Sequence, residues 1–332
     1  MTGAAVRAFL VMVLVATPSV ILPGIGTDTK QMVALVALFA GALTFAEYNA
    51  TYPSLVEFRD APPFNRIRFL MLLAIVFTLS VVSSAKGSDA AFPRLFEAVA
   101  VLIGHAMDFP YSPVRLATMM MAGGASESQV VAVRTAAGTA YILSLVTLAF
   151  FVLLFKLRGW PDRTQAFNVW VNLPTFEPTA GGDVVDRLER DARANLAFGV
   201  LLPFLIPAVV NLASVGFEPL TLTSPQTLIW TMTAWAFLPA SLLMRGIAMG
   251  RIASMIQQKR AQNGAVGGAV VPAARSSLLP PLSLRWSLPS LRWPRSCASP
   301  PGTAIFRARG RGFWPATSPG ATIRRSWPRC RS

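Results

Sequence analysis

The chain has 332 residues, of which 53% are hydrophobic and only 14% are charged, and its mean hydropathy is +0.51. Soluble domains carry roughly 25% charged residues, so this composition excludes an ordinary soluble protein and indicates membrane spans. The net charge of +15 does not indicate nucleic-acid binding, because residues 264–332 alone hold 11 arginines and no acidic residue. The rest of the chain has 19 basic and 15 acidic residues.

Both cysteines, Cys297 and Cys330, lie in this C-terminal stretch, and His105 is the single histidine. Residues 1–262 therefore offer no disulfide, no thiolate metal site and no cysteine nucleophile. We expect the chain to hold neither a metal ion nor a cofactor.

Three apolar stretches predict the first membrane spans, at residues 8–23, 32–48 and 69–85. The first also resembles a secretory signal, because Arg7 precedes an apolar core. No A-x-A cleavage site follows it, and we expect an uncleaved helix. Gly41 in the second span would let a neighbouring helix approach closely.

Residues 49–68, between the second and third spans, form a loop broken by prolines. Its basic residues are Arg59, Arg66 and Arg68. Glu47, at the end of the second span, is the only ionisable residue inside a predicted span. An acid deep in the bilayer is a functional candidate, but polar residues follow Glu47 directly, which favours a position at the interface.

The region after the third span holds a short apolar piece, Leu95 to Met107. Apolar segments of about 10–14 residues more often re-enter the membrane or lie at its surface than cross it. We therefore expect a short re-entrant or interfacial helix between the third and fourth spans.

Three polar residues of this helical region, Glu97, His105 and Asp108, are candidates for a proton relay or a metal site. They lack a repeated ligand spacing such as H-x-x-x-H, which makes the metal signal weak. The solvated polar ends of an interfacial helix are the favoured explanation.

A fourth span is predicted at residues 138–155, after a capping box at 126–129. The loop that follows, residues 156–193, is the largest charged island of the apolar part. From Asp183 onward we predict an amphipathic helix that continues into the next span. In this helix an acid precedes each of Arg187, Arg190 and Arg193 by four residues.

The last two predicted spans are residues 194–214 and 226–244, and Arg245 follows the second of them. Asn211, together with a pair of prolines in the fifth span, indicates one of two things. It marks a discontinuous helix that lines a transport pathway, or an ordinary membrane helix kinked by proline. No internal repeat with matching interruptions is evident, so we favour the ordinary helix.

Basic residues predict the orientation. With six spans, both termini and both charged loops share one side, which holds 14 basic residues of 1–262 against five on the other. The positive-inside rule makes that side cytoplasmic (N-in/C-in). The residues that anchor this topology are Arg59, Arg66, Arg68, Arg187, Arg190, Arg193 and Arg245. We expect an all-α, polytopic membrane domain over residues 1–262, in the cytoplasmic (inner) membrane of a bacterium.

Residues 263–332 are rich in Arg, Pro, Ser and Trp and show no sustained periodicity, so we predict a disordered tail. Two origins stay open. One is a basic tail that binds anionic lipid headgroups. The other is out-of-frame translation of a GC-rich gene, which produces the same residue types.

The sequence contains no catalytic motif, and we expect no enzyme. We predict an accessory, assembly or scaffold component of a membrane complex. It would contact lipid and bind a membrane-protein partner through the loops 49–68 and 156–193. A small-molecule transporter or channel is the alternative, and a membrane-embedded enzyme is the third hypothesis.

Overall fold

The structure is a computed structural model that describes residues 2–87, 89–121, 125–158, 160, 172–176, 181–213 and 222–268. These residues are mostly helical and contain no strand. The helices are α1 (Thr2–Ile21), α2 (Thr27–Asn49), α3 (Phe64–Ser84), the 3₁₀ turn η1 (Ala85–Gly87), α4 (Ala91–Met107), α5 (Pro113–Thr118), α6 (Glu127–Arg158), α8 (Val184–Ala213) and α9 (Pro225–Gly268).

Six of the described helices are long and apolar enough to cross a bilayer, namely α1, α2, α3, α6, α8 and α9. The predicted all-α membrane class with six spans is therefore confirmed. α6, α8 and α9 extend beyond their apolar parts into polar sequence. α9 continues to Gly268, so the first residues of the predicted tail are helical. The disorder predicted for the remainder lies outside the described residues.

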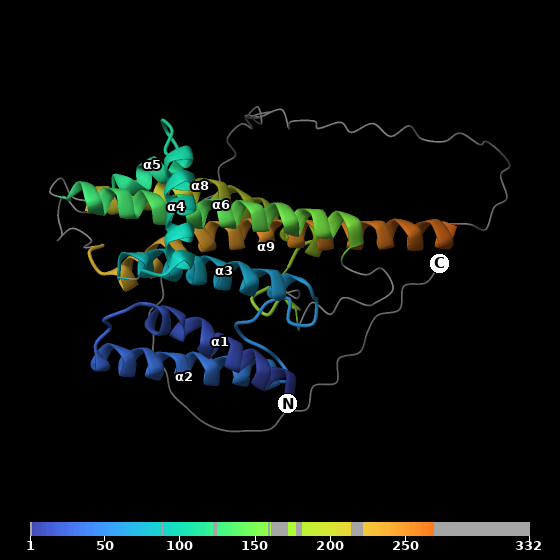
Figure 1. The fold of residues 1–332 in the computed structure, drawn as a ribbon. Coiled ribbons are helices and arrows are strands. Elements are labelled where there is room, and N and C mark those ends of the chain that lie inside the picture. Colours follow the sequence, from blue (N-terminus) through green and yellow to red (C-terminus); the bar gives the residue numbers. More distant parts are fainter. Residues whose placement is uncertain are drawn as a thin grey trace, which may run out of the picture. The chain divides into compact units, whose positions relative to one another are not determined.

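The helices have two common ends. α1 and α3 begin at the end of the bundle that holds Glu57, and α2 and α6 finish there, while α8 begins beyond it, beside the last turns of α9; we call this the Glu57 end. The opposite end, where α4 and α5 lie, is the His105 end. α3, α6, α8 and α9 pack together, with α8 and α9 in the most extensive contact (Figure 1). α1 and α2 form a hairpin that meets the other helices through α1.

The hairpin is closely packed at Gly41, as its sequence predicts. A Cβ atom at Gly41 would lie 2.6 Å from Cγ of Met12 on α1, so a larger residue would require the Met12 side chain to move. α2 makes no comparable contact with any other described helix. Most of its apolar side chains therefore face outward, as expected of a helix surrounded by lipid.

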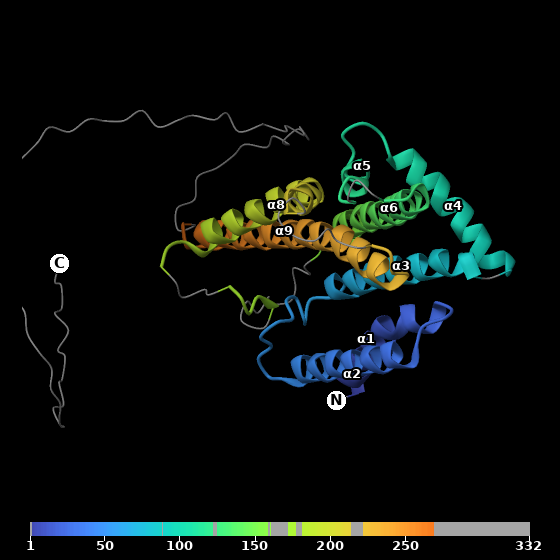
Figure 2. The ribbon, with the colours of Figure 1, turned by 90° about the vertical axis from the view of Figure 1, so that its left-hand side faces the viewer.

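α4 runs across α3 and α6 rather than alongside them, as Figures 1 and 2 both show. Its 17 residues do not place it among the candidate spans. It crosses α6 where Gly104 meets Gly138, and a Cβ on Gly138 would lie 2.7 Å from the Gly104 Cα. The helix predicted here is thus present, and its crossing depends on two glycines.

The two prolines inside α8 do not interrupt it, so the discontinuous helix considered above is not formed. Pro207 has no N–H and leaves the carbonyl of Pro203 without its helical donor. The indole Nε1 of Trp235 on α9 donates to that carbonyl at 3.2 Å. A neighbouring helix therefore satisfies the freed group, which is how membrane helices tolerate proline.

α6 begins at the predicted capping box. The backbone N–H of Ser126 donates to Oε1 of Gln129 at 2.9 Å, and the N–H of Gln129 donates to the Ser126 hydroxyl at 3.4 Å. The reciprocal pair satisfies two of the amide groups that the first turn of a helix leaves open.

The glycine crossing gives a test with a matched control. We expect Gly138→Ala to lower the free energy of unfolding by about 1–3 kcal/mol, because the new Cβ meets backbone atoms that cannot rotate away. Gly250→Ala is the control, since its Cβ would lie 3.8 Å from its nearest neighbour. It should be neutral or stabilising by up to about 1 kcal/mol, through helix propensity. Thermal unfolding in detergent compares them, and equal shifts would contradict the close crossing.

Candidate functional site

The charged side chains of the described residues gather at the two ends of the helices. At the Glu57 end, the carboxylate of Glu57 accepts from Nε of Arg245 at 2.6 Å and from Nη2 at 2.8 Å. The Thr175 hydroxyl donates to the same carboxylate at 2.7 Å, and Nη1 of Arg245 donates to Oδ1 of Asn195 at 3.0 Å. The side chain of Glu57 is 11% exposed and that of Arg245 is 25% exposed. This two-point contact is the strong form of an ion pair.

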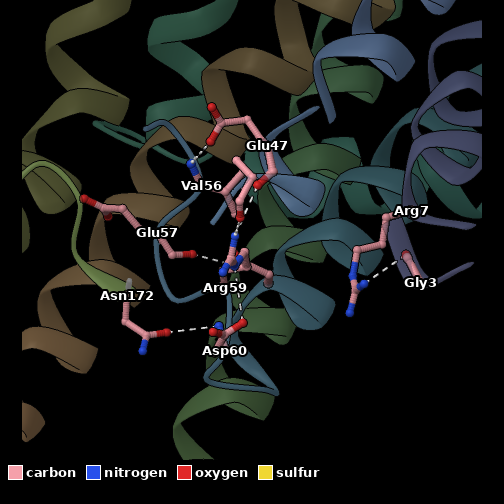
Figure 3. Close-up of polar contacts among 10 residues, drawn as sticks. Gly3, Arg7, Glu47, Val56, Glu57, Arg59, Asp60 and Asn172 are labelled. Atoms are coloured by element: carbon pink, nitrogen blue, oxygen red, sulfur yellow. Dashed lines mark hydrogen bonds and ion pairs between the residues drawn. The ribbon is translucent and has the colours of Figure 1, made fainter. Parts of the chain in front are cut away.

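Glu47, at the end of α2, also binds the 50–63 loop. Its carboxylate accepts from the backbone N–H groups of Ser54, Leu55 and Val56, at 3.0, 2.9 and 3.2 Å, and from the Ser54 hydroxyl at 2.6 Å (Figure 3 shows the bond to Val56). Glu47 thus lies at the end of α2, as expected, where it is buried and bonded to the 50–63 loop. It has a structural role here.

The 50–63 loop is also bound to segments that follow α6. The backbone N–H of Phe58 donates to the carbonyl of Asn172 at 2.7 Å, and the N–H of Asp60 donates to Oδ1 of the same residue at 3.0 Å (Figure 3). The indole of Trp160 donates to the carbonyl of Pro62 at 2.9 Å. Parts of the two predicted loops, 49–68 and 156–193, therefore form one folded unit.

An aromatic cluster lies beneath this unit. Phe58 and Phe64 have ring centroids 4.3 Å apart, Phe151 and Phe155 lie 3.9 Å apart, and Phe155 stacks on Trp160 at 4.4 Å. All five side chains are buried. Each such pair contributes about 0.5–1.5 kcal/mol beyond its buried area, so the cluster adds to the rigidity of the unit.

The first turns of α8 and the end of α9 pair beyond the apolar part. The carboxylate of Asp183 accepts from Nη1 of Arg260 at 2.9 Å, and Gln257 donates to Glu189 at 2.8 Å. The N–H of Val185 and then Arg260 lower the pKa of Asp183 below its usual value. Of the predicted pairs four residues apart, Glu189–Arg193 is formed at 3.7 Å, while Asp183 pairs across to α9 instead.

At the His105 end, Asp108 is held by two arginines. Its carboxylate lies 2.9 Å from Nε of Arg115 and 3.2 Å from Nε of Arg134, and the side chain is 13% exposed. Nη1 of Arg134 also lies 3.1 Å from Nδ1 of His105. The solvated position expected for Asp108 is therefore wrong, because the residue ties the end of α4 to α5 and α6.

Glu97 does not join His105 and Asp108. It lies two helical turns before His105 on α4, about 12 Å away along the axis. Together with Lys86 it lines a separate cavity of about 150 Å³ at the His105 end. The three predicted candidates are therefore divided between two places and form no shared relay.

Asn211 does not line a pathway through the bundle in the described part. Its side chain is exposed, and its amide donates to the carbonyl of Met119 at 2.8 Å, after α5. It therefore fastens the short α5 segment to α8.

The predicted topology anchors lie at the Glu57 end, as their sequence positions require. Arg59 donates to the carbonyl of Ala50 at 2.5 Å, Arg68 lies over Phe64 and Phe237, and Arg187 lies over Phe176. Sequence reasoning missed Glu57, the partner of Arg245. Nothing in its local sequence distinguishes it from other acids of the loop, because the two residues are 188 positions apart.

The contacts described above join loops and helices to one another. No group of three or more His, Cys, Asp or Glu among them could hold a metal ion. Comparisons with models of known families, with curated proteins and with solved structures find no match for this chain. Fold and side chains define an all-helical, multi-pass membrane protein.

The Glu57–Arg245 pair gives the second test. Glu57→Gln leaves a half-buried guanidinium without its charge partner, and we expect a loss of about 2–4 kcal/mol of stability. Asp60→Asn is the control, since Asp60 is 60% exposed and pairs with Arg59 only at 3.3 Å. Its loss should be under about 1 kcal/mol. Thermal denaturation followed by size-exclusion chromatography in detergent measures both, and indistinguishable shifts would refute the special role of Glu57.

Proposed function

We propose that this protein is a non-catalytic scaffold or assembly component of a membrane complex, in the cytoplasmic membrane of a bacterium with both termini in the cytoplasm. The observation that carries the proposal is the folded unit at the Glu57 end. The basic anchors gather at this end, which supports its cytoplasmic placement through the positive-inside rule.

Length supports a docking role for this end. The apolar part of α9 ends near Met244, and residues 245–268 continue the helix for about 36 Å. The first turns of α8 pair with this extension. We call the paired segments, residues 184–194 and 245–263, the stalk. A span needs only about 20 residues, so the stalk is available for a task outside the bilayer.

The stalk has a buried seam and a charged surface. Leu188 and Ala192 on α8 are buried with Met249 and Ile252 on α9, so the stalk needs no partner to cover its apolar face. Its exposed side chains include Arg190, Arg193, Lys259 and Arg260. A surface of this kind attracts and orients a partner with an acidic face.

Transport of small molecules is the competing function. The observation that bears on it is the cavity lined by Lys86 and Glu97. That cavity lies at one end of the bundle. In the described helices, Asp, Glu, Lys and Arg lie at the ends of the apolar stretches or beyond them, whereas ion-coupled transport generally uses polar or charged groups at mid-membrane. The scaffold role therefore has the stronger support. A membrane enzyme would need Glu97, His105 and Asp108 together.

Charge reversal on the stalk tests the scaffold function. Arg190→Glu and Lys259→Glu change exposed side chains that form no hydrogen bond or ion pair with other described residues, so folding should persist. We expect each to reduce, by about tenfold or more, the proteins that co-purify with the native chain in mild detergent, since like charges facing each other cost several kcal/mol. Quantitative mass spectrometry measures the recovery.

Lys30→Glu serves as the control, because Lys30 is exposed and lies at the His105 end. It should leave the co-purifying proteins unchanged. Recovery of the native chain without partners, or equal recovery from all variants, would refute docking through the stalk.

A further inference from the structure

A small cavity lies between the first three helices at the Glu57 end. Its volume is about 140 Å³. α1 lines it with Arg7, Leu10 and Val11, α2 with Tyr48, and α3 with Arg66 and Phe69. The two arginines lie nearer the start of α1 and α3 than the apolar lining residues do, since each arginine comes before the apolar residues of its helix.

The two arginines of this cavity have no acidic partner among the described residues. Arg7 donates to the carbonyl of Gly3 on its own helix at 2.9 Å and lies 4.6 Å from the centre of the Tyr48 ring (Figure 3 shows the bond to Gly3). Arg66 is exposed and forms no hydrogen bond or ion pair with the part of the chain that the structure describes.

The nearby carboxylates are already bound elsewhere. Glu47 accepts four hydrogen bonds from residues 54–56, and Glu57 is paired with Arg245. Asp60, whose charge acts on Tyr48, is paired with Arg59 at 3.3 Å. The described part of the cavity therefore presents two positive charges without compensation. Such a site attracts an anion and offers nothing to neutralise the ammonium group of a zwitterionic molecule.

Size and position narrow the class of anion. A cavity of about 140 Å³ has the volume of about five water molecules at roughly 30 Å³ each. It accommodates a phosphate and its ester groups, but not two acyl chains. The apolar wall of Leu10, Val11 and Phe69 continues along helices that are apolar enough to cross a bilayer. A ligand with a phosphate at the helix ends and chains beside the helices fits both features.

We propose that this cavity binds the phosphate of an anionic phospholipid through Arg7 and Arg66. Basic pockets between membrane helices are suited to such headgroups. The proposal does not depend on the scaffold function, because it uses neither the stalk nor the orientation of the chain.

The bound lipid would join two parts that otherwise have limited contact. The α1–α2 hairpin meets the other described helices through α1. A phosphate bridging Arg7 on α1 and Arg66 on α3 fastens the hairpin where α1 and α3 both begin. The lipid is then a structural component of the folded protein.

The experiment uses the full chain in nanodiscs of phosphatidylcholine with increasing phosphatidylglycerol, and measures the thermal midpoint and the lipid retained in native mass spectrometry. We expect phosphatidylglycerol to raise the midpoint and to be retained. Arg7→Gln and Arg66→Gln should each weaken retention about fivefold, the ratio that about 1 kcal/mol per charge at the membrane surface predicts. Arg66→Lys should recover part of it.

The arginines after residue 263 attract anionic lipid in every variant alike, so the comparison is between variants of the same chain. Lys30→Gln removes an exposed charge at the other end and should change nothing. Equal retention by the wild type, Arg7→Gln and Arg66→Gln would overturn the proposal. So would inorganic phosphate in phosphatidylcholine discs raising the midpoint as much as phosphatidylglycerol does, since that result would assign the site to free phosphate.

Discussion

The ion pair between Glu57 and Arg245 is the interaction on which the Glu57 end depends. It joins the 50–63 loop to α9, and the same two side chains bind Thr175 and Asn195. Four segments distant in sequence therefore meet at one pair. Charges removed from water stabilise a fold only if their remaining donors and acceptors are also bonded. Here the Thr175 hydroxyl donates to Glu57, and the Asn195 amide oxygen accepts from Arg245. These neutral partners are why the ion pair tolerates partial burial.

The bilayer explains why this junction lies where the apolar parts of the spans end. Inside the hydrocarbon an unpaired backbone group costs several kcal/mol, so irregular segments and their charges are confined to the ends of the spans. Within the spans the described structure uses other means. Glycines bring α4 onto α6, and Trp235 bonds the carbonyl that Pro207 frees in α8. The loops are held by hydrogen bonds at the ends of the spans. Glu47 is an example, because its carboxylate accepts from three consecutive backbone amides.

The local sequence pattern was enough to predict the helices. It was not enough to predict which side chains from distant segments bind one another. Apolar runs of about 20 residues, the 126–129 capping box and the amphipathic start of α8 each depend on neighbours in sequence, and the structure contains all of them. Glu57 could not be found in this way, because its partner follows after several intervening helices. The prediction of a solvated Asp108 was wrong for the same reason, because one of the two arginines that bind it lies on α6.

Hydropathy also could not distinguish helices that face lipid from helices that face protein. In α2 only 11% of the apolar window is buried, against 50% in α3, although both read as spans. The difference comes from packing alone, because α2 rests only on α1 among the described helices. Among the described residues, the hairpin is therefore attached to the bundle by few contacts. They are the buried face of α1, the bonds between the 50–63 loop and Glu47, including one from Arg59 to its carbonyl, and one bond from Gln226 to Ser19. The cavity in which we propose that an anionic lipid binds lies at this junction, so a ligand there would add contacts where the hairpin has few of its own.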